Sequence, residues 1–181
     1  LMNRMLTPHQ MPVYKKTNIH EILERVRSLI LSEFSSDITF IRDYDVSLPE
    51  FIVDREKLIQ AILNIARNGA QAMKLNNQDN MQLSFITRAE RQIVFRKKKH
   101  ATAIRIDIID NGPGIKNELI DKIFFPLVTG KENGSGLGLS LSQNLISLHQ
   151  GMIDCHSVPG KTVFSIILPI ENNLMPTKEK K

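Results

Sequence analysis

The sequence predicts a two-layer α/β sandwich (α+β), in which three helices cover a mixed, mostly antiparallel sheet of five strands. Three segments have the spacing of apolar residues that amphipathic helices need, and about five shorter apolar segments have the length of strands. The last two of these, 152–157 and 162–168, are separated only by a turn at Pro159-Gly160. Parallel neighbours need a crossover of about a dozen residues, so this order argues against a doubly wound parallel sheet.

The composition suits one globular domain with an apolar core. Of the 181 residues, 41% are hydrophobic and 24% are charged. No apolar run approaches the roughly 20 residues that span a bilayer, and the first residues lack the pattern of a signal peptide. The single cysteine, Cys155, allows no internal disulfide. We therefore expect a cytoplasmic protein without a membrane partner.

Much of the net charge of +5 lies in Arg96–Lys99 and in the last residues, 178–181. Nucleic-acid surfaces often combine such charge with aromatic side chains on which bases stack. Of the 2 Tyr and 8 Phe residues, only Phe95 lies beside the basic run. We expect a solvated hairpin tip and a frayed terminus, and no nucleic-acid partner.

The first third of the chain contains one predicted helix and one predicted strand. Residues 1–17 include two prolines and are predicted to be a helical end followed by a linker. Asn18 is a suitable N-cap for a helix of about 16 residues, because apolar residues recur after it at helical spacing. A short strand is predicted at 38–42 and a turn at 45–49. Asp54 is the expected cap of a longer helix that ends near residue 75.

The rest of the chain is predicted to supply the remaining strands and two helices. The segments 81–87 and 92–95 suggest a β-hairpin, and 102–109 alternates between isoleucine and polar residues. A short helix is expected near 116–123 and a longer one at 139–149. Residues 171–181 have the composition of a disordered tail.

A glycine-rich segment, TGKENGSGLGLS (129–140), precedes the last helix. It matches neither the Walker A loop nor the Rossmann fingerprint, so an ordinary turn at a helix entrance is one reading. The other is an anion site, because backbone N–H groups at a helix N-terminus bind phosphate without any side chain. In that reading Lys131 would reach phosphate oxygens, and Leu137 and Leu139 would face inward.

An acidic turn, Asp110-Asn111-Gly112-Pro113-Gly114, follows the alternating strand directly. It would serve as a tight turn that ends the strand. A carboxylate at the end of a buried strand would also accept a hydrogen bond from the exocyclic amine of adenine. Guanine presents an acceptor at that position and would be rejected.

The second predicted helix carries a narrow polar arc formed by Gln60, Asn64, Arg67, Asn68 and Gln71. A solvated helix face explains these residues in the simplest way. Asparagine is a below-average helix former, however, and Asn64 and Asn68 are one turn apart. Two amide oxygens on one face suit Mg²⁺, which takes few protein ligands and relies on substrate phosphates for the rest.

Together these segments resemble the ATP-binding (GHKL-type) fold of gyrase-type ATPases, Hsp90 chaperones, MutL proteins and bacterial histidine kinases. The resemblance covers about 18–170, and its motifs stand in the family order. They are an N box at 64–68, a G1 box at 110–114, an F box at Phe124-Phe125-Pro126, a G2 box at 134–139 and the closing strands around Pro159–Phe164.

The residue at position 64 indicates the branch of the family. Hydrolysing members carry a glutamate there that activates water, and an amide cannot act as a general base. Asn64 therefore favours transfer to another nucleophile, as in the histidine kinases. The segments 41–50, 81–109 and 126–140 resemble the NtrB type of nitrogen-regulation kinase. Gly69 departs from the alanine usual after the second asparagine and should cost the helix about 1 kcal/mol.

The resemblance implies ATP and Mg²⁺ as ligands, with Asn68 and Asn64 holding the metal. The implied nucleotide-binding residues are Asn64, Asn68, Asp110, Gly112, Gly114, Lys131, Gly134, Ser135, Gly136, Leu137, Gly138 and Thr162. A phosphoacceptor motif, in which a proline follows His-Glu or His-Asp, is absent, and His20-Glu21 lacks that proline. We therefore expect no autophosphorylation by this chain alone.

The same resemblance implies a larger protein. Residues 1–17 would be the end of a dimerisation helix and its linker, and 18–170 the catalytic domain. The expected partners are the protein's own dimerisation domain in a homodimer, an NtrC-like response regulator and a PII-type signal protein. An ATP-hydrolysing module and a docking module without chemistry are the alternatives.

Overall fold

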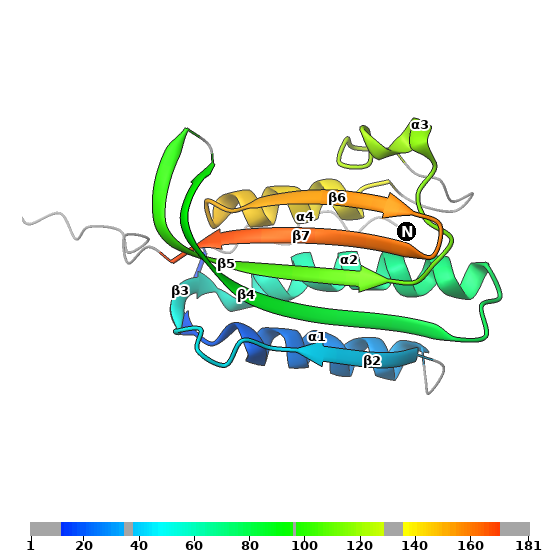
Figure 1. Cartoon of the computed structure of the whole chain (residues 1–181), viewed down its shortest axis with the longest axis horizontal. Coiled ribbons are helices and arrows are strands. Elements are labelled where there is room, and N and C mark those ends of the chain that lie inside the picture. Colours follow the sequence, from blue (N-terminus) through cyan, green and yellow to red (C-terminus); the bar gives the residue numbers. More distant parts are fainter. Residues whose placement is uncertain (1–11, 35–37, 96, 129–135, 171–181) are drawn as a thin grey trace, which may run out of the picture.

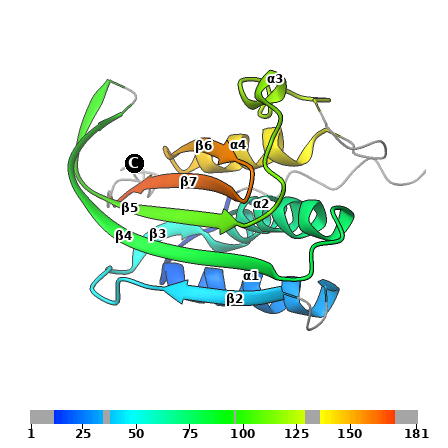
Figure 2. The ribbon, with the colours of Figure 1, turned by 45° about the vertical axis from the view of Figure 1, so that its right-hand side comes forward.

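The computed structural model describes residues 12–34, 38–95, 97–128 and 136–170. Its main sheet has five strands in the order β2-β4-β5-β7-β6, in which only β2 and β4 are parallel. Helices α1, α2 and α4 lie together on one face of this sheet (Figure 1 and Figure 2). The predicted two-layer α/β sandwich is confirmed.

The predicted helices are present, with small shifts at their ends. They are α1 (Ile19–Phe34), α2 (Arg55–Leu75), the short α3 (Asn117–Ile120) and α4 (Gly138–Leu148). The strands of the main sheet are β2 (Ile38–Asp43), β4 (Met81–Phe95), β5 (Lys98–Asp110), β6 (Met152–Val158) and β7 (Lys161–Pro169). No helix in the described part of the chain is long and apolar enough to cross a membrane. The predicted tail, 171–181, lies outside the described residues.

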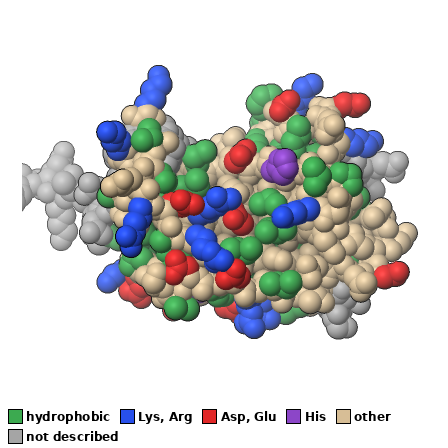
Figure 3. Space-filling view, in the orientation of Figure 1, with side chains coloured by type: hydrophobic (Ala, Val, Ile, Leu, Met, Phe, Trp, Pro, Cys, Tyr) green, Lys and Arg blue, Asp and Glu red, His purple; other side chains and the backbone are tan. Residues whose placement is uncertain are grey.

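The apolar core lies between the two layers. On β5, Ile104, Ile106 and Ile108 are buried, as their alternation predicts. Arg105 and Asp107 lie on the opposite face, where Arg105 Nε donates to Asp107 Oδ1 at 3.0 Å. Figure 3 shows basic and acidic side chains interspersed over this outer face. The sheet therefore has one face on the core and one in water, as antiparallel sheets commonly do.

Both predicted helix caps are formed. Asn18 Oδ1 accepts a hydrogen bond from His20 N at 2.9 Å, and Asp54 Oδ1 accepts one from Lys57 N at 3.1 Å. Each carboxyl or amide oxygen thus satisfies a backbone donor in the first turn of its helix. Behind its cap, α2 turns an apolar face to the core, and the polar arc stays on the other side.

A second, two-stranded sheet was not predicted. It pairs β1 (Tyr14–Thr17) with β3 (Phe51–Asp54) in antiparallel register. Its strands have four residues each, which is too short for a clear alternation, and they lie far apart in the sequence. Asp54 Oδ2 accepts a hydrogen bond from Val13 N at 2.9 Å, so the cap of α2 also holds the chain just before β1.

The prediction of a hairpin between 81–87 and 92–95 is wrong. These residues form one continuous strand, β4, which pairs with β5 from Leu83–Asp110 to Phe95–Lys98. The polar residues between them suggested a turn, yet they lie in a part of β4 that β2 no longer flanks. The pairing of β2 ends at Ile86 and that of β7 at Ala103. Beyond Ala103, β4 and β5 continue as a two-stranded ribbon, which bends away from the sheet in Figure 1.

His149, at the end of α4, joins three elements. The side chain is buried, and its Nε2 accepts a hydrogen bond from Asp54 N at 3.0 Å. Its Nδ1 donates to Leu145 O at 2.8 Å, so these two backbone partners fix a neutral tautomer. Burial lowers the pKa of His149, in keeping with the neutral ring. The ring also meets Tyr14 of β1 edge-on, so His149 has a structural role.

Candidate functional site

The candidate site begins at the end of β5, where Asp110 continues the inward-facing row of isoleucines. Its Cα partners are Leu83 on β4 and Thr162 on β7, so it is held in the middle of the sheet. Residues directly opposite each other on antiparallel strands share a face, which places Thr162 beside Asp110. Asp110 is only 6% exposed. A carboxylate therefore stands at the rim of the apolar core.

The protein contacts of the Asp110 carboxylate are few. Its Oδ1 accepts a hydrogen bond from Gly112 N at 2.9 Å. Among the residues that the structure describes, none donates to Oδ2. Burial raises the pKa of Asp110 above its usual range, and the hydrogen bond from Gly112 opposes this shift. The arrangement suits a ligand that donates a hydrogen bond to Oδ2.

Asn111 fixes the turn that follows, a role that the sequence analysis missed. Its Oδ1 accepts from Gln82 N at 2.9 Å, and its Nδ2 donates to Asn80 O at 2.8 Å. Gln78 Nε2 donates to Asn111 O at 3.0 Å. Asparagine is common in turns, so its type indicated a turn but not which segment it would bind.

Gly114 and Thr162 lie on the other side of the turn. Gly114 has φ +85°, and a Cβ there would lie 3.0 Å from the Val158 and Pro159 backbone. Thr162 is buried, and its Oγ1 lies 2.8 Å from Ser157 Oγ. The turn from β6 to β7 thus closes against the turn after β5.

The polar face of α2 meets the first turn of α4. Asn64 Nδ2 donates to Gly138 O at 3.4 Å, and a Cβ on Gly138 would lie 3.9 Å from Asn68 Nδ2. Ser142 Oγ donates to Ala61 O at 2.9 Å, which fastens the two helices together. The N-cap residue of α4, Leu137, makes no side-chain capping bond. The positive end of the α4 dipole therefore lies beside both asparagines.

Gly136 leads into α4 under tight packing. It has φ +64°, and a Cβ there would lie 2.5 Å from the carbonyl carbon of Leu127. Leu127 N also donates to Gly136 O at 3.0 Å. The expectation that Leu137 faces inward is wrong, because it is 49% exposed, whereas Leu139 is half-buried against the core. The close approach of Gly136 to Leu127 fixes the backbone just before Leu137 and leaves that side chain in solvent.

The structure therefore brings the predicted residues together in two adjacent groups. One comprises Asp110, Gly112, Gly114 and Thr162, and the other comprises Asn64, Asn68 and the segment 136–138. They adjoin on α2, because Gly69, which contacts Asp110, follows Asn68. Lys131, Gly134 and Ser135 lie outside the described residues.

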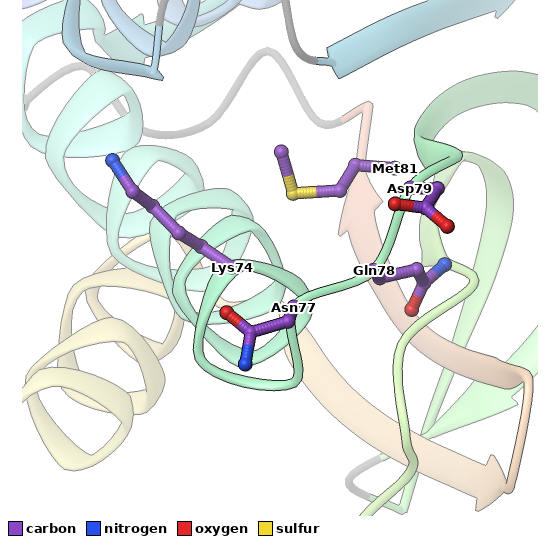
Figure 4. A pocket seen from close by; sticks show the side chains of 5 residues that line it. All are labelled: Lys74, Asn77, Gln78, Asp79 and Met81. Carbon is purple, nitrogen blue, oxygen red and sulfur yellow. The ribbon is translucent and has the colours of Figure 1, made fainter.

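A shallow hollow of about 390 Å³ lies near this site and is shown in Figure 4. Its lining residues come from the end of α2 and the connection to β4, and they are Lys74, Asn77, Gln78, Asp79 and Met81. None of the predicted nucleotide-binding residues lines it. Gln78 lines the hollow and also donates a hydrogen bond to Asn111 in the turn after β5.

Comparison with known proteins identifies the family to which the chain belongs. A family model described as "Histidine kinase-, DNA gyrase B-, and HSP90-like ATPase" matches residues 53–172. The chain therefore belongs to this family of ATPases. Within the family it is NtrB-like, as the following relatives show.

The chain is 46% identical over 170 residues to the sensory histidine kinase/phosphatase NtrB of Vibrio alginolyticus. It is 43% identical over 171 residues to the NtrB of Escherichia coli O157:H7. Each match covers 94% of this chain and 48% of the relative, so the chain spans about half the length of these curated relatives. A solved structure of the mycobacterial sensor histidine kinase MprB has a TM-score of 0.69 and 23% identity, covering 87% of this chain and 97% of that one. That likeness shows the shared fold.

Replacing the buried carboxylate should stabilise the ligand-free domain at pH 7. Because the folded state raises the pKa of Asp110, it favours the protonated form. The Asp110 carboxyl group makes its full contribution to the free energy of unfolding below about pH 3.9, its pKa in the unfolded chain. This contribution is lost as the pH rises through the pKa of the folded state. Asp110→Asn removes this loss, so urea unfolding at pH 7 should show the variant to be more stable than wild type.

The difference in the free energy of unfolding between Asp110→Asn and wild type should shrink as the pH is lowered toward about 4. The exposed Asp154 on β6 provides a matched control, and Asp154→Asn should leave stability unchanged at both pH values. A variant less stable than wild type at pH 7 would contradict the unfavourable burial of this carboxylate.

Gly136→Ala should destabilise the domain through both strain and overlap. The positive φ alone costs a non-glycine residue about 1–3 kcal/mol, and the Leu127 backbone leaves no room for a methyl group. Gly160→Ala is the matched control, because Gly160 also has a positive φ, +85°, but no atom lies within 4 Å of its Cβ position. Urea denaturation should show a larger loss for Gly136→Ala, and equal losses would argue against the packing of Gly136 on Leu127.

Proposed function

We propose that the chain is the ATP-binding catalytic domain of an NtrB-like sensor histidine kinase. It would transfer the γ-phosphoryl group of ATP to a histidine on a dimerisation segment outside this chain. In that step the bond from the γ-phosphorus to the β-γ bridging oxygen breaks and a phosphorus–nitrogen bond forms. The imidazole loses its proton, and ADP leaves. The observation that carries the proposal is the buried Asp110 carboxylate, whose Oδ2 has no donor among the described residues.

The Asp110 carboxylate would account for the preference for adenine over guanine. The exocyclic amine of adenine would donate to Oδ2, while Gly112 N holds Oδ1. Guanine would place a carbonyl oxygen against the same carboxylate, which is repulsive and leaves a buried acceptor without a donor. Thr162, beside Asp110 on β7, would support the base through its hydroxyl.

The phosphates would lie at the start of α4. Its first-turn N–H groups and helix dipole favour an anion there, and the helix has the length for this effect. Transfer of a phosphoryl group depends mostly on positioning and charge stabilisation, so such a site supplies much of what the reaction needs. The cap residue Leu137 supplies no side chain to compete with a phosphate.

The two asparagines fit Mg²⁺ through their amide oxygens. With Nδ2 of Asn64 directed to Gly138 O, its Oδ1 is the atom suited to a hard cation, and Asn68 lies one turn further along α2. We assign the metal to Asn68 with help from Asn64. When bound, Mg²⁺ would neutralise charge on the phosphates.

The nucleophile would be a histidine rather than water. Asn64 stands where hydrolysing relatives carry a glutamate, and an amide cannot take a proton from water. His20 is not suited to accept the phosphoryl group, because its Nε2 lies 3.0 Å from Thr87 Oγ1 and its ring stacks on Tyr44. A neutral imidazole elsewhere in the full-length protein would attack instead.

The larger protein and its partners are part of the same proposal. Because the chain spans about half of its NtrB relatives, the missing half would hold the dimerisation domain and its histidine. Residues 1–17 would connect the two domains, and β1 would dock the end of this connection on the catalytic domain. A homodimer in the cytoplasm would phosphorylate an NtrC-like response regulator under control of a PII-type signal protein.

A thermal-shift comparison tests the ligands. ATP and ADP should raise the melting temperature of the domain, GTP should not, and Mg²⁺ should increase the ATP effect. Asn68→Ala should remove the Mg²⁺-dependent part. Gln60→Ala, on the exposed part of the same helix face, should keep it. Equal shifts with ATP and GTP would contradict adenine recognition by Asp110.

Transfer of labelled γ-phosphate tests the reaction. The isolated domain with Mg-ATP should stay unlabelled, whereas the full-length protein with its dimerisation segment should gain an acid-labile phosphate. Rapid acid-labile labelling of the isolated domain would contradict an acceptor outside this chain. Steady phosphate release by the isolated domain, lost in Asn64→Ala, would show an ATPase instead.

A further inference from the structure

Gly69 lies in the interior of α2 and is buried. A glycine weakens a helix relative to alanine, because it adds backbone freedom to the unfolded chain. Its φ is not positive, so the backbone conformation does not require glycine here. The reason for a glycine must therefore be a neighbour that needs the space of a side chain.

That neighbour is the carboxylate of Asp110. A Cβ on Gly69 would lie 2.9 Å from Asp110 Oδ2, 3.0 Å from its Cβ and 3.1 Å from its Cγ. On the other side, a Cβ on Gly112 would lie 2.8 Å from Asp110 Oδ1 and 3.2 Å from Met73 Cγ. The carboxylate thus lies between two residues that have no side chain.

Asp110 has little freedom to avoid an added methyl group at position 69. Its backbone is paired on both sides, with Leu83 and Thr162, and its Oδ1 is held by Gly112 N. Helix α2 cannot retreat either, because Ile65 and Met73 on either side of Gly69 are fully buried in the core. A methyl group would therefore displace the carboxylate itself.

We infer that Gly69 is a positioning residue for adenine recognition, which sets the place of the Asp110 carboxylate for the exocyclic amine of a 6-aminopurine nucleotide. This inference rests on the proposed function. The lost helix propensity at Gly69 is then the consequence of a requirement of the site.

Isothermal titration of Gly69→Ala with two nucleotides tests the inference. The probes are ADP and the diphosphate of purine riboside, which lacks the 6-amino group. Gly69→Ala should lower the affinity for ADP by about tenfold or more, because a hydrogen bond to a charged group is lost or distorted. The affinity for the purine riboside nucleotide should change little. Both nucleotides are compared on one variant, so a partly unfolded sample would lower both affinities alike.

A double-mutant cycle and a control variant complete the experiment. In the Asp110→Asn background, Gly69→Ala should have almost no further effect on ADP, because the two residues act through one contact. Ala72→Gly, three residues further along the same helix, lowers helix propensity and removes one half-buried methyl group. It should leave the preference for ADP over the purine riboside nucleotide intact.

The outcomes separate the inference from the proposed function. Wild-type protein that binds no ADP would contradict the proposed function itself. Wild-type binding that Asp110→Asn weakens, together with a Gly69→Ala variant that loses both nucleotides equally or neither, would overturn only the role of Gly69. A Gly69→Ala domain that fails to fold by circular dichroism would also overturn it, since the contact would then serve folding.

Discussion

The site depends on one constraint, the burial of the Asp110 carboxylate at the end of an apolar strand face. Three isoleucines of β5 precede it on the same face, and the core continues up to it. Burying an acid there is unfavourable unless it is paired, and the described part of the chain supplies one donor, Gly112 N. The second oxygen has no donor among the described residues. The fold therefore gives up stability at this position, and a ligand with a suitable donor would recover it.

Helix α2 links this carboxylate to the rest of the site. Gly69 packs against Asp110. Asn68 and Asn64, which precede Gly69 on the same helix, lie beside the start of α4. The far ends of the same two helices are joined by His149 and Asp54, where β1 also docks. The base end and the phosphate end of the proposed site are thus carried by two helices that are joined at both ends of α4. Such a rigid frame is what the positioning of a phosphoryl group requires.

Local patterns in the sequence predicted most of the fold, and long-range contacts account for what they missed. The alternation of β5 places Asp110 on the core face, and Asn18 and Asp54 cap their helices as expected. The pairing of β1 with β3 has no local signal. The polar residues of β4 resembled a turn, and they lie beyond the end of β2, where β4 has no neighbour on that side. From the sequence, Gly69 only lowered the expected stability of α2. Its contact with Asp110 exists only in the folded chain and has no local signal.

The most direct measurement is a crystal structure of the domain with Mg²⁺ and a non-hydrolysable ATP analogue. The adenine amine should lie about 3 Å from Asp110 Oδ2, within hydrogen-bond distance. The phosphates should lie at the first turn of α4, with the metal beside Asn68. A nucleotide bound in the hollow beside Lys74, or one whose amine faces away from Asp110, would contradict the account.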